Sequence, residues 1–268
     1  MPFFYYFDPT YILVVIGLII SVWAQITVQS TFNKYSRVRV SRGITGADAA
    51  RQVLSHGGVR DVAIKGIRGS MTDHYDPRDN SISLSETVCG ASTAAAIGVA
   101  AHEAGHALQH AEGYGPIKLR MTIIPICNFA SSLAMPLFLL GILFSSWNPE
   151  TSFGFLMMQA GIIAFSVAVF FQVVTLPVEF NASRRAMAAL EATGYYTEEE
   201  LDGARKVLRA AAMTYVAALA VSLLQILRLV ILSNTRRRSW LKIKTSAAPP
   251  STFLCEWKKR KAKATQTA

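Results

Sequence analysis

Residues 91–111 read ASTAAAIGVAAHEAGHALQHA, and this Ala-rich stretch predicts a helix around which the rest of the chain can be interpreted. It contains the HExxH pattern His102-Glu103-Ala104-Gly105-His106. Side chains four residues apart lie on the same face of a helix, so both imidazoles can reach one metal ion. The alternative is a pair of surface histidines beside a solvated glutamate. The surrounding small residues favour close packing beside a site instead.

The chemistry of these three residues favours zinc. Imidazole nitrogens are good zinc ligands, and a catalytic zinc commonly takes three protein ligands and one water. Bound zinc lowers the pKa of its water towards about 7, and the adjacent Glu103 carboxylate can then take the proton as general base. The pattern therefore predicts His102 and His106 as metal ligands and Glu103 as the catalytic residue.

The third ligand is not given by the spacings of the familiar zincin classes. A metzincin would need Gly at 109 and His at 112, where this chain has Gln109 and Glu112. A thermolysin-like ligand would fall near Ile126, inside an apolar run. His110 lies two helical turns from His102, too far to share the same ion, and is expected to be a neighbouring polar residue.

Glu179 is the best remaining candidate for the third ligand. The apolar runs before it are expected to form a hairpin, which returns the chain to the side of the HExxH helix. Pro177 fits the first turn of a new helix and would place Glu179 at the membrane surface. The alternative is a carboxylate that only stabilises a helix N-terminus. Asp202, in Leu201-Asp202-Gly203, follows three glutamates in a polar stretch, and we expect a solvated helix start there.

Four long apolar runs predict membrane-spanning helices, because each reaches the length needed to cross the hydrocarbon core. They cover residues 11–28, 122–147, 153–175 and 210–227. One such run is also compatible with a buried core helix, but four in 268 residues favour the membrane. The first run exceeds the apolar region of a signal peptide and lacks a basic leader, so we expect a retained anchor.

Basic residues beside the runs predict the orientation. They follow the first and third runs, as Lys34, Arg37, Arg39, Arg42, Arg184 and Arg185. This pattern places the N-terminus outside and residues 30–121 and 176–209 inside. Four crossings would then leave the basic C-terminal tail outside. Either the last run is re-entrant or the tail is exported despite its charge.

The composition excludes a disordered chain and argues against a simple soluble globule, because 51% of residues are hydrophobic and 16% are charged. The formal net charge of +10 arises almost wholly from residues 233–268, which hold ten basic residues and one acidic residue. We expect an interfacial or disordered tail rather than nucleic-acid binding. Cys89, Cys127 and Cys255 show no metal-type spacing and predict no disulfide framework.

The polar segment between the first two runs predicts a small α+β domain. Thr45 and Asp48 resemble a capping box that starts a short helix. Residues 61–67 and 81–85 alternate and predict two strands, the second of which could pair with an extended substrate as an edge strand. His74 and Tyr75 lie in the loop between them, where either could stabilise an oxyanion or simply belong to a structural turn.

The motifs make the chain resemble the YugP-type membrane neutral zinc metallopeptidase family of bacteria and, more distantly, the HtpX and CAAX prenyl protease type of membrane gluzincin. The matching stretches are Gly43-Ile44-Thr45-Gly46, Met71 to Arg78, Ala101 to Ala107, Leu176-Pro177-Val178-Glu179-Phe180 and Thr214-Tyr215-Val216-Ala217-Ala218. The resemblance covers about residues 3–235. It implies that His102, His106 and Glu179 bind zinc and that Glu103 is the base.

Two positions depart from the pattern of these families. Ser183 stands where the more distant type has Asp, and Asn181 stands where the family tends to have Asp. A carboxylate that would orient a ligand histidine is therefore missing or replaced.

The sequence thus predicts a mainly α integral membrane protein, with about four transmembrane helices and a small α+β zincin-like domain at the cytosolic face. Its predicted segments are an anchor (1–29), a cytosolic-face domain (30–121), a transmembrane hairpin (122–175), a helical segment with the third ligand (176–209), a fourth apolar helix (210–232) and a disordered tail (233–268).

The predicted function is zinc-dependent hydrolysis of peptide bonds in membrane or membrane-proximal proteins, at the cytosolic face of the bacterial inner membrane. The partners expected are a protein or peptide substrate and the lipid bilayer, with Zn²⁺ as cofactor and no nucleic acid. The oligomeric state stays open. The alternative is a non-proteolytic membrane protein that binds zinc structurally or acts as a scaffold.

Overall fold

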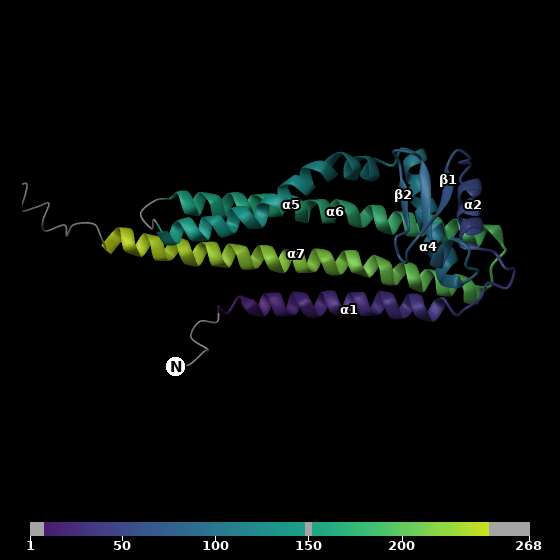
Figure 1. Ribbon diagram of the computed structural model, residues 1–268, viewed down its shortest axis with the longest axis horizontal. Coiled ribbons are helices and arrows are strands. Elements are labelled where there is room, and N and C mark those ends of the chain that lie inside the picture. The colour runs from purple at the N-terminus through teal and green to yellow at the C-terminus, as the bar shows by residue number, and fades with distance from the viewer. Residues whose placement is uncertain (1–7, 148–151, 247–268) are drawn as a thin grey trace, which may run out of the picture. The chain divides into compact units, whose positions relative to one another are not determined.

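The computed structural model describes residues 8–147 and 152–246, which form seven helices and three strands in this part of the chain (Figure 1). In chain order they are α1 (Tyr11–Tyr35), α2 (Gly46–His56), β1 (Ala63–Ile67), β2 (His74–Asp76), β3 (Ser81–Ser85), α3 (Glu86–Cys89), α4 (Ala94–Ala111), α5 (Gly115–Trp147), α6 (Phe153–Thr193) and α7 (Glu198–Ser246). The predicted fold class, a mainly α membrane protein with a small α+β part, is confirmed.

The chain divides into two compact units. The first contains the described residues up to Phe129 together with Val167–Gln225, and the second contains Ala130–Ser166 and the described residues from Ile226 onward. The first unit holds α1 to α4, the small sheet and all the predicted site residues.

The second unit is held together by apolar side chains from three helices. Phe138 of α5, Met158 and Ile162 of α6 and Leu229 of α7 form its buried cluster. Glycines allow α5 and α6 to approach closely, because a Cβ on Gly141 would lie 2.7 Å from the Gly154 carbonyl oxygen. A hydrogen bond of 2.9 Å from Gln159 Nε2 to Ser233 Oγ also joins α6 to α7.

The helix predicted near Thr45 is present as α2. The Thr45 hydroxyl accepts a hydrogen bond from the Asp48 amide at 3.2 Å, and the Asp48 carboxylate accepts one from the Thr45 amide, also at 3.2 Å. This reciprocal pair is the predicted capping box. Helix α2 then packs against α4 through Ala50, Val53 and Leu54, and these residues form part of the main buried cluster.

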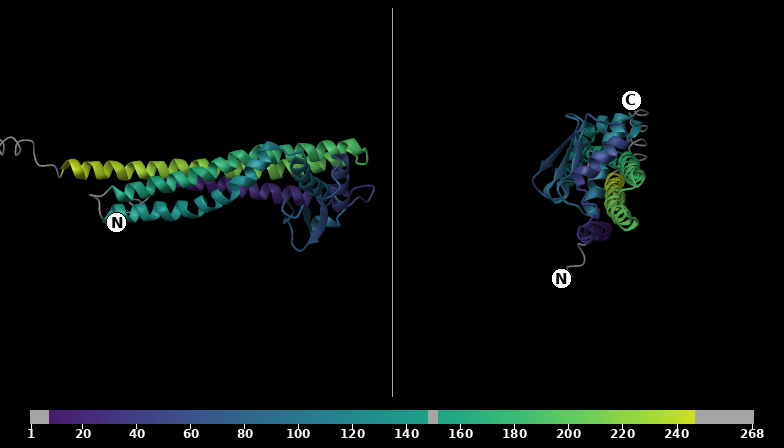
Figure 2. Two further views of the ribbon diagram at one scale, coloured as in Figure 1. Left: turned by 90° about the horizontal axis from the view of Figure 1, so that it is seen from above. Right: turned by 90° about the vertical axis from the view of Figure 1, so that its right-hand side faces the viewer.

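The sheet corrects two of the sequence predictions. Its strand order is β1-β3-β2, with β3 parallel to β1 and antiparallel to β2. Strand β3 (residues 81–85) is therefore central and cannot act as the edge strand for a substrate. The short strand β2 (residues 74–76), expected to be a loop, is itself an edge strand. Figure 2 shows this small sheet beside the helices of the first unit.

Both faces of β3 are buried, although its sequence alternates between serine and apolar residues. The serine hydroxyls are satisfied inside the protein. Ser81 Oγ donates to Asp79 at 2.7 Å, and Ser85 Oγ donates to Asp73 at 3.0 Å. Burial of the polar positions is therefore compatible with the strand, because these hydroxyls have acceptors.

Four helices are long and apolar enough to cross a membrane: α1, α5, α6 and the part of α7 from Glu198 to Arg236. Their apolar side chains are largely on the outside, with Leu18 and Ile26 of α1 each 62% exposed. Such exposure is unfavourable in water and matches a lipid environment. The four predicted spans are therefore present as helices.

Two predicted boundaries are wrong. Helix α6 continues through Pro177 instead of ending before a new helix, and long membrane-spanning helices tolerate such a proline. Helix α7 continues without a break from Glu198 to Ser246, so residues 233–246 of the predicted disordered tail are helical. No Gly or Pro interrupts residues 233–246, which leaves nothing to stop the helix. The remainder of the tail lies outside the described residues.

Candidate metal centre

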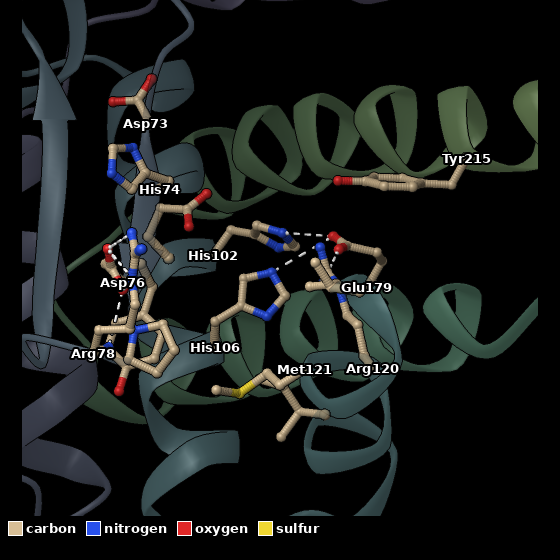
Figure 3. Close-up of a pocket in the computed structure, with 15 residues that line it drawn as sticks. Asp73, His74, Asp76, Arg78, His102, His106, Arg120, Met121, Glu179 and Tyr215 are labelled. Atoms are coloured by element: carbon tan, nitrogen blue, oxygen red, sulfur yellow. Dashed lines mark hydrogen bonds and ion pairs between the residues drawn. The ribbon is translucent and has the colours of Figure 1, made fainter. Parts of the chain in front are cut away.

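Helix α4 presents His102 and His106 side by side (Figure 3). The two rings meet edge to face, with their centroids 4.7 Å apart. The four-residue spacing produces this arrangement, because it places both side chains on one face of the helix. The helix is buried on most sides, so the imidazoles are held in a packed environment.

Helix α6 brings Glu179 to the two histidines. Its Oε2 atom lies 3.2 Å from His102 Nε2 and 3.5 Å from His106 Nε2, and the residue is 1% exposed. Gly105, between the histidines, permits this approach. A Cβ there would lie 2.5 Å from the carbonyl oxygen of Ala182 on α6, closer than real Cβ contacts allow.

The far side of each imidazole ring also has a partner. His102 Nδ1 lies 3.1 Å from Ser183 Oγ, and His106 Nδ1 lies 3.1 Å from Gln109 Oε1. Gln109 is fully buried, and its Nε2 donates to the Val178 carbonyl at 2.8 Å and to Asn181 Oδ1 at 2.9 Å. These contacts orient the amide so that its oxygen faces His106. A hydroxyl and an amide therefore occupy the places where the resemblance led us to expect a carboxylate.

These hydrogen bonds favour the neutral tautomer that a metal requires. A carbonyl-type oxygen such as Gln109 Oε1 can only accept, so His106 Nδ1 carries the proton and Nε2 keeps its lone pair. The Ser183 hydroxyl can accept from His102 Nδ1 in the same way. Both Nε2 atoms then face Glu179, which is the orientation typical of histidine ligands.

The spacing of the three side chains fits a zinc ion. Ligand atoms about 2.0–2.1 Å from a tetrahedral zinc are separated from one another by about 3.4 Å. The observed separations of Glu179 Oε2 from the two imidazole nitrogens, 3.2 and 3.5 Å, bracket that value. Among the described residues, His102, His106 and Glu179 form a group with all three ligand atoms within 4.8 Å of one another.

Arg120 of α5 holds the other carboxylate oxygen. Its Nη1 donates to Glu179 Oε1 at 2.7 Å, which leaves Oε2 facing the histidines. A buried carboxylate needs such partners, because desolvation without them is costly. Burial alone would lower the pKa of His106, but the hydrogen bond with Glu179 and the negative charges of Glu103 and Glu179 raise it above its usual range.

Two cavities meet at this group of residues. The larger, about 620 Å³, is lined by α4, α5 and the loop and strand around β2, including Asp73, His74 and Arg120. The second, about 360 Å³, is lined by α1, α4, α6 and α7, including Phe32, Val99 and Leu208. His102, Glu103, Glu179 and Tyr215 line both cavities. Glu103 is thus next to the candidate ligands and in contact with the space that a substrate would occupy.

The structure separates the other sequence candidates. His74 is exposed at the edge of the larger cavity. Tyr75 is committed to other contacts, because its hydroxyl donates to Asn80 Oδ1 at 2.8 Å and lies 3.0 Å from His110 Nδ1. Burial and nearby aspartates raise the pKa of Tyr75 to about 12, which keeps it protonated. Asp202 pairs with Lys206 at 2.6 Å and lies outside the metal group.

Sequence reasoning missed Tyr215 and Arg120 as members of the site. Tyr215 of α7 points its hydroxyl towards His102 and Glu179 (Figure 3). Tyr215 lies in one of the stretches that carry the family resemblance, but no spacing rule connects it with a motif more than one hundred residues earlier. Arg120 stands just before an apolar run, where a basic residue is also expected for topology.

The fold and the three-residue group together define a membrane protein with the ligand set of a zinc peptidase. Residues 10–234 match the family described as "Putative neutral zinc metallopeptidase", and the chain belongs to this family. It is also 49% identical over 220 residues to "Putative membrane protease YugP" of Bacillus subtilis (strain 168), which covers 82% of this chain and 94% of that protein. No solved structure matches the chain significantly. The family predicted from the motifs is confirmed.

Proposed function

We propose that this protein is a zinc-dependent endopeptidase that cleaves membrane or membrane-proximal proteins at the cytosolic face of the bacterial inner membrane. The observation that carries the proposal is the convergence of His102, His106 and Glu179, with Glu103 beside them, on two cavities. The family of the chain supports peptide hydrolysis as the reaction.

The proposed metal ligands are His102 Nε2, His106 Nε2 and Glu179 Oε2. When bound there, zinc would polarise the scissile carbonyl and increase the acidity of a water molecule. Ser183, Gln109 and Arg120 hold the three ligands in place through the hydrogen bonds described above. Fixed ligands leave little reorganisation for metal binding.

Glu103 is proposed as the proton carrier. Its carboxylate accepts a proton from the attacking water as the new carbon–oxygen bond forms. The same proton then passes to the amide nitrogen as the carbon–nitrogen bond breaks, so that the leaving amine departs neutral. A nearly buried carboxylate at the edge of both cavities is suited to this transfer, because bulk water does not compete for the proton.

Tyr215 is the proposed donor to the developing oxyanion. Its hydroxyl points into the space next to His102 and Glu179, and a phenol can donate a hydrogen bond without adding charge (Figure 3). This role replaces the one considered for Tyr75, whose hydroxyl is engaged by Asn80 and His110.

The two cavities support an extended substrate that crosses the metal centre. On one side, the exposed edge of β2 offers main-chain groups to a peptide. On the other side, the cavity beside α1 and α7 is lined mainly by apolar and small residues such as Val28, Phe32 and Ala212. A polypeptide with an apolar segment near the scissile bond matches this lining.

The cytosolic placement rests on charge distribution. Basic residues follow α1, namely Lys34, Arg37, Arg39 and Arg42, and Arg184 and Arg185 lie close to Glu179 in α6. Short basic flanks favour the cytosolic side. Reporter fusions after residue 60 and within the loop between α5 and α6 should report opposite sides of the membrane.

The function is tested with the purified full chain and casein as substrate. Glu103→Gln should retain the zinc content of the wild type and lose cleavage by at least about a hundredfold, because the proton carrier is absent. Glu86→Gln, at an exposed position on α3, is the matched control and should cleave normally. Full cleavage by Glu103→Gln would contradict the mechanism. Zinc binding without any cleavage by the wild type would favour the non-proteolytic alternative.

A further inference from the structure

A third cavity lies between α1 and α7, away from the metal centre. It has a volume of about 420 Å³ and is lined by residues of these two helices alone: Trp23, Thr27, Thr31, Lys34, Tyr35, Lys206, Arg209, Ala210 and Met213. None of these residues lines either cavity at the metal centre. On α7 the two sets lie on opposite faces, because residues 206, 210 and 213 share one side and 208, 212 and 215 share the other. We refer to this third cavity as the α1–α7 groove.

The groove changes in chemistry along its length. Lys34 of α1 and Lys206 and Arg209 of α7 lie at one end, where both helices leave their apolar runs. Trp23 and Met213 lie further within the apolar runs. With a rise of 1.5 Å per residue, Trp23 is about 16 Å from Lys34 along α1. This length corresponds to a lipid headgroup and the first part of an acyl chain.

The helices are packed closely enough to form a defined groove. A Cβ on Gly17 of α1 would meet the Val221 side chain of α7 at 3.4 Å. Figure 1 shows α1 running beside α7. The close contact at Gly17 and the cationic end at Lys34 place the groove between two antiparallel apolar helices, open to the side where lipid is expected.

The cationic end carries an excess of positive charge. Lys206 is paired with Asp202 at 2.6 Å, and Lys34 lies over the Tyr35 ring at 5.3 Å from its centroid. Arg209 is exposed, and no carboxylate pairs with it within the described ranges 8–147 and 152–246. An anion that enters the groove would therefore meet at least two cations that no acidic side chain neutralises.

We propose that the α1–α7 groove is a binding site for one anionic phospholipid. Lys34 and Arg209 bind the phosphodiester, with the Thr31 hydroxyl as a further donor, and an acyl chain lies along Trp23 and Met213. Arginine and lysine are the side chains that recognise phosphate, and Trp and Tyr are enriched at the depth of lipid headgroups. A zwitterionic headgroup is disfavoured, because its ammonium group would be repelled by the same cations.

Lipid bound here would join α1 to α7 from the side opposite the metal centre. Residues of the same two helices, Phe32 and Leu208, line the smaller cavity beside the catalytic group. The groove therefore gives the membrane a direct contact with the helices that shape the proposed substrate site. The proposal itself concerns binding alone and does not depend on peptide hydrolysis.

Native mass spectrometry of the delipidated full chain in detergent tests the proposal. We expect one phosphatidylglycerol molecule to bind about tenfold more tightly than phosphatidylcholine. Lys34→Gln combined with Arg209→Gln should remove this preference. The matched control, Arg60→Gln combined with Arg68→Gln, removes the same charge at exposed positions outside the groove and should keep it. Equal binding of both lipids by the wild type, or equal loss in both double variants, would overturn the site.

Two further arms separate other sources of the signal. Inorganic phosphate at millimolar concentration should not displace the lipid, and displacement would indicate a free-anion site instead. A photoactivatable phosphatidylglycerol bound to the wild type should crosslink to peptides containing Trp23 or Met213. Crosslinks confined to other helices would contradict the proposal, and this measurement holds even where the double variant fails to fold. Neither readout requires cleavage, so failure of the peptidase assay leaves this test intact.

Discussion

Helices α4 and α1 are both rich in apolar and small residues, yet their surroundings are opposite. Most of α4 is buried by the rest of the first unit, whereas only Gly17, Ala24, Phe32 and Tyr35 are buried in α1. Polar side chains in α4 are tolerated because each has a partner, as Gln109 does. Apolar side chains in α1 are exposed because lipid, not protein, is the expected neighbour. Similar composition therefore serves a catalytic core in one helix and a membrane contact in the other.

The largest expected difference between the two helices is in stability. Ile97 of α4 is fully buried, so Ile97→Ala should lower the free energy of unfolding by about 2–5 kcal/mol. Leu18 of α1 is 62% exposed, and Leu18→Ala should change it by less than about 0.5 kcal/mol, because lipid tails are as apolar as leucine. Unfolding in mixed micelles measures both. Comparable losses would show that α1 is buried against protein.

The next largest effect concerns the polar contacts of α4. Glu179→Gln removes the anionic ligand and should weaken zinc binding by more than about a hundredfold, exceeding the loss expected when a ligand's hydrogen-bond partner is removed. Competition with a chelator of known affinity measures this. Glu191→Gln, exposed on the same helix, is the control and should bind zinc as the wild type does. Unchanged zinc stoichiometry in Glu179→Gln would remove Glu179 from the ligand set.

Gly105 tests how closely α4 must meet α6. Gly105→Ala should destabilise the protein by about 1–3 kcal/mol, because the added Cβ meets the Ala182 carbonyl oxygen at 2.5 Å and backbone must move. Zinc affinity should fall with it, since α6 carries Glu179. Gly115→Ala, with nothing within 4 Å, should be neutral or stabilising. Equal behaviour of the two variants in thermal unfolding would contradict the close approach.

The sequence predicted best where local chemistry decides the outcome. The HExxH helix, the capping box at Thr45 and the four apolar helices depend on spacing and composition within a short stretch, and the structure contains all of them. Glu179 required one further step, the return of a helical hairpin. The structure places its carboxylate beside both imidazoles as that step predicts.

The errors arose where distant segments determine the outcome. Strand β3 is central only because β2, too short to show a periodic pattern, pairs with its free side. Pro177 does not end α6, because a membrane-spanning helix tolerates proline in ways that a surface helix does not. Tyr215 and Arg120 reach the site through packing between helices, which no local motif records.

The partners of the imidazole rings provide a smaller effect. Gln109→Leu removes the acceptor of His106 Nδ1 and should weaken zinc binding by about 10–100-fold, without removing a ligand. Ser183→Ala should act in the same direction at His102, whereas Ser92→Ala, whose hydroxyl contacts only the Gly43 carbonyl, should not. The spectrum of the Co²⁺-substituted protein should shift in the first two variants. Wild-type affinity and spectrum in Gln109→Leu would show that the amide only fills space.

The smallest expected effect is the response of zinc binding to pH. The pKa of His106 is raised in the metal-free protein, so the stabilisation from its protonated form is present below about pH 6.5 and is lost as pH rises through the raised value. Zinc requires the neutral ring, so its affinity should change in the opposite sense and fall by up to about tenfold per unit as pH is lowered from 8 to 6. Chelator competition at each pH measures this. His56→Ala, on exposed α2, should leave the profile unchanged, and a flat wild-type profile would exclude His106 from the ligands.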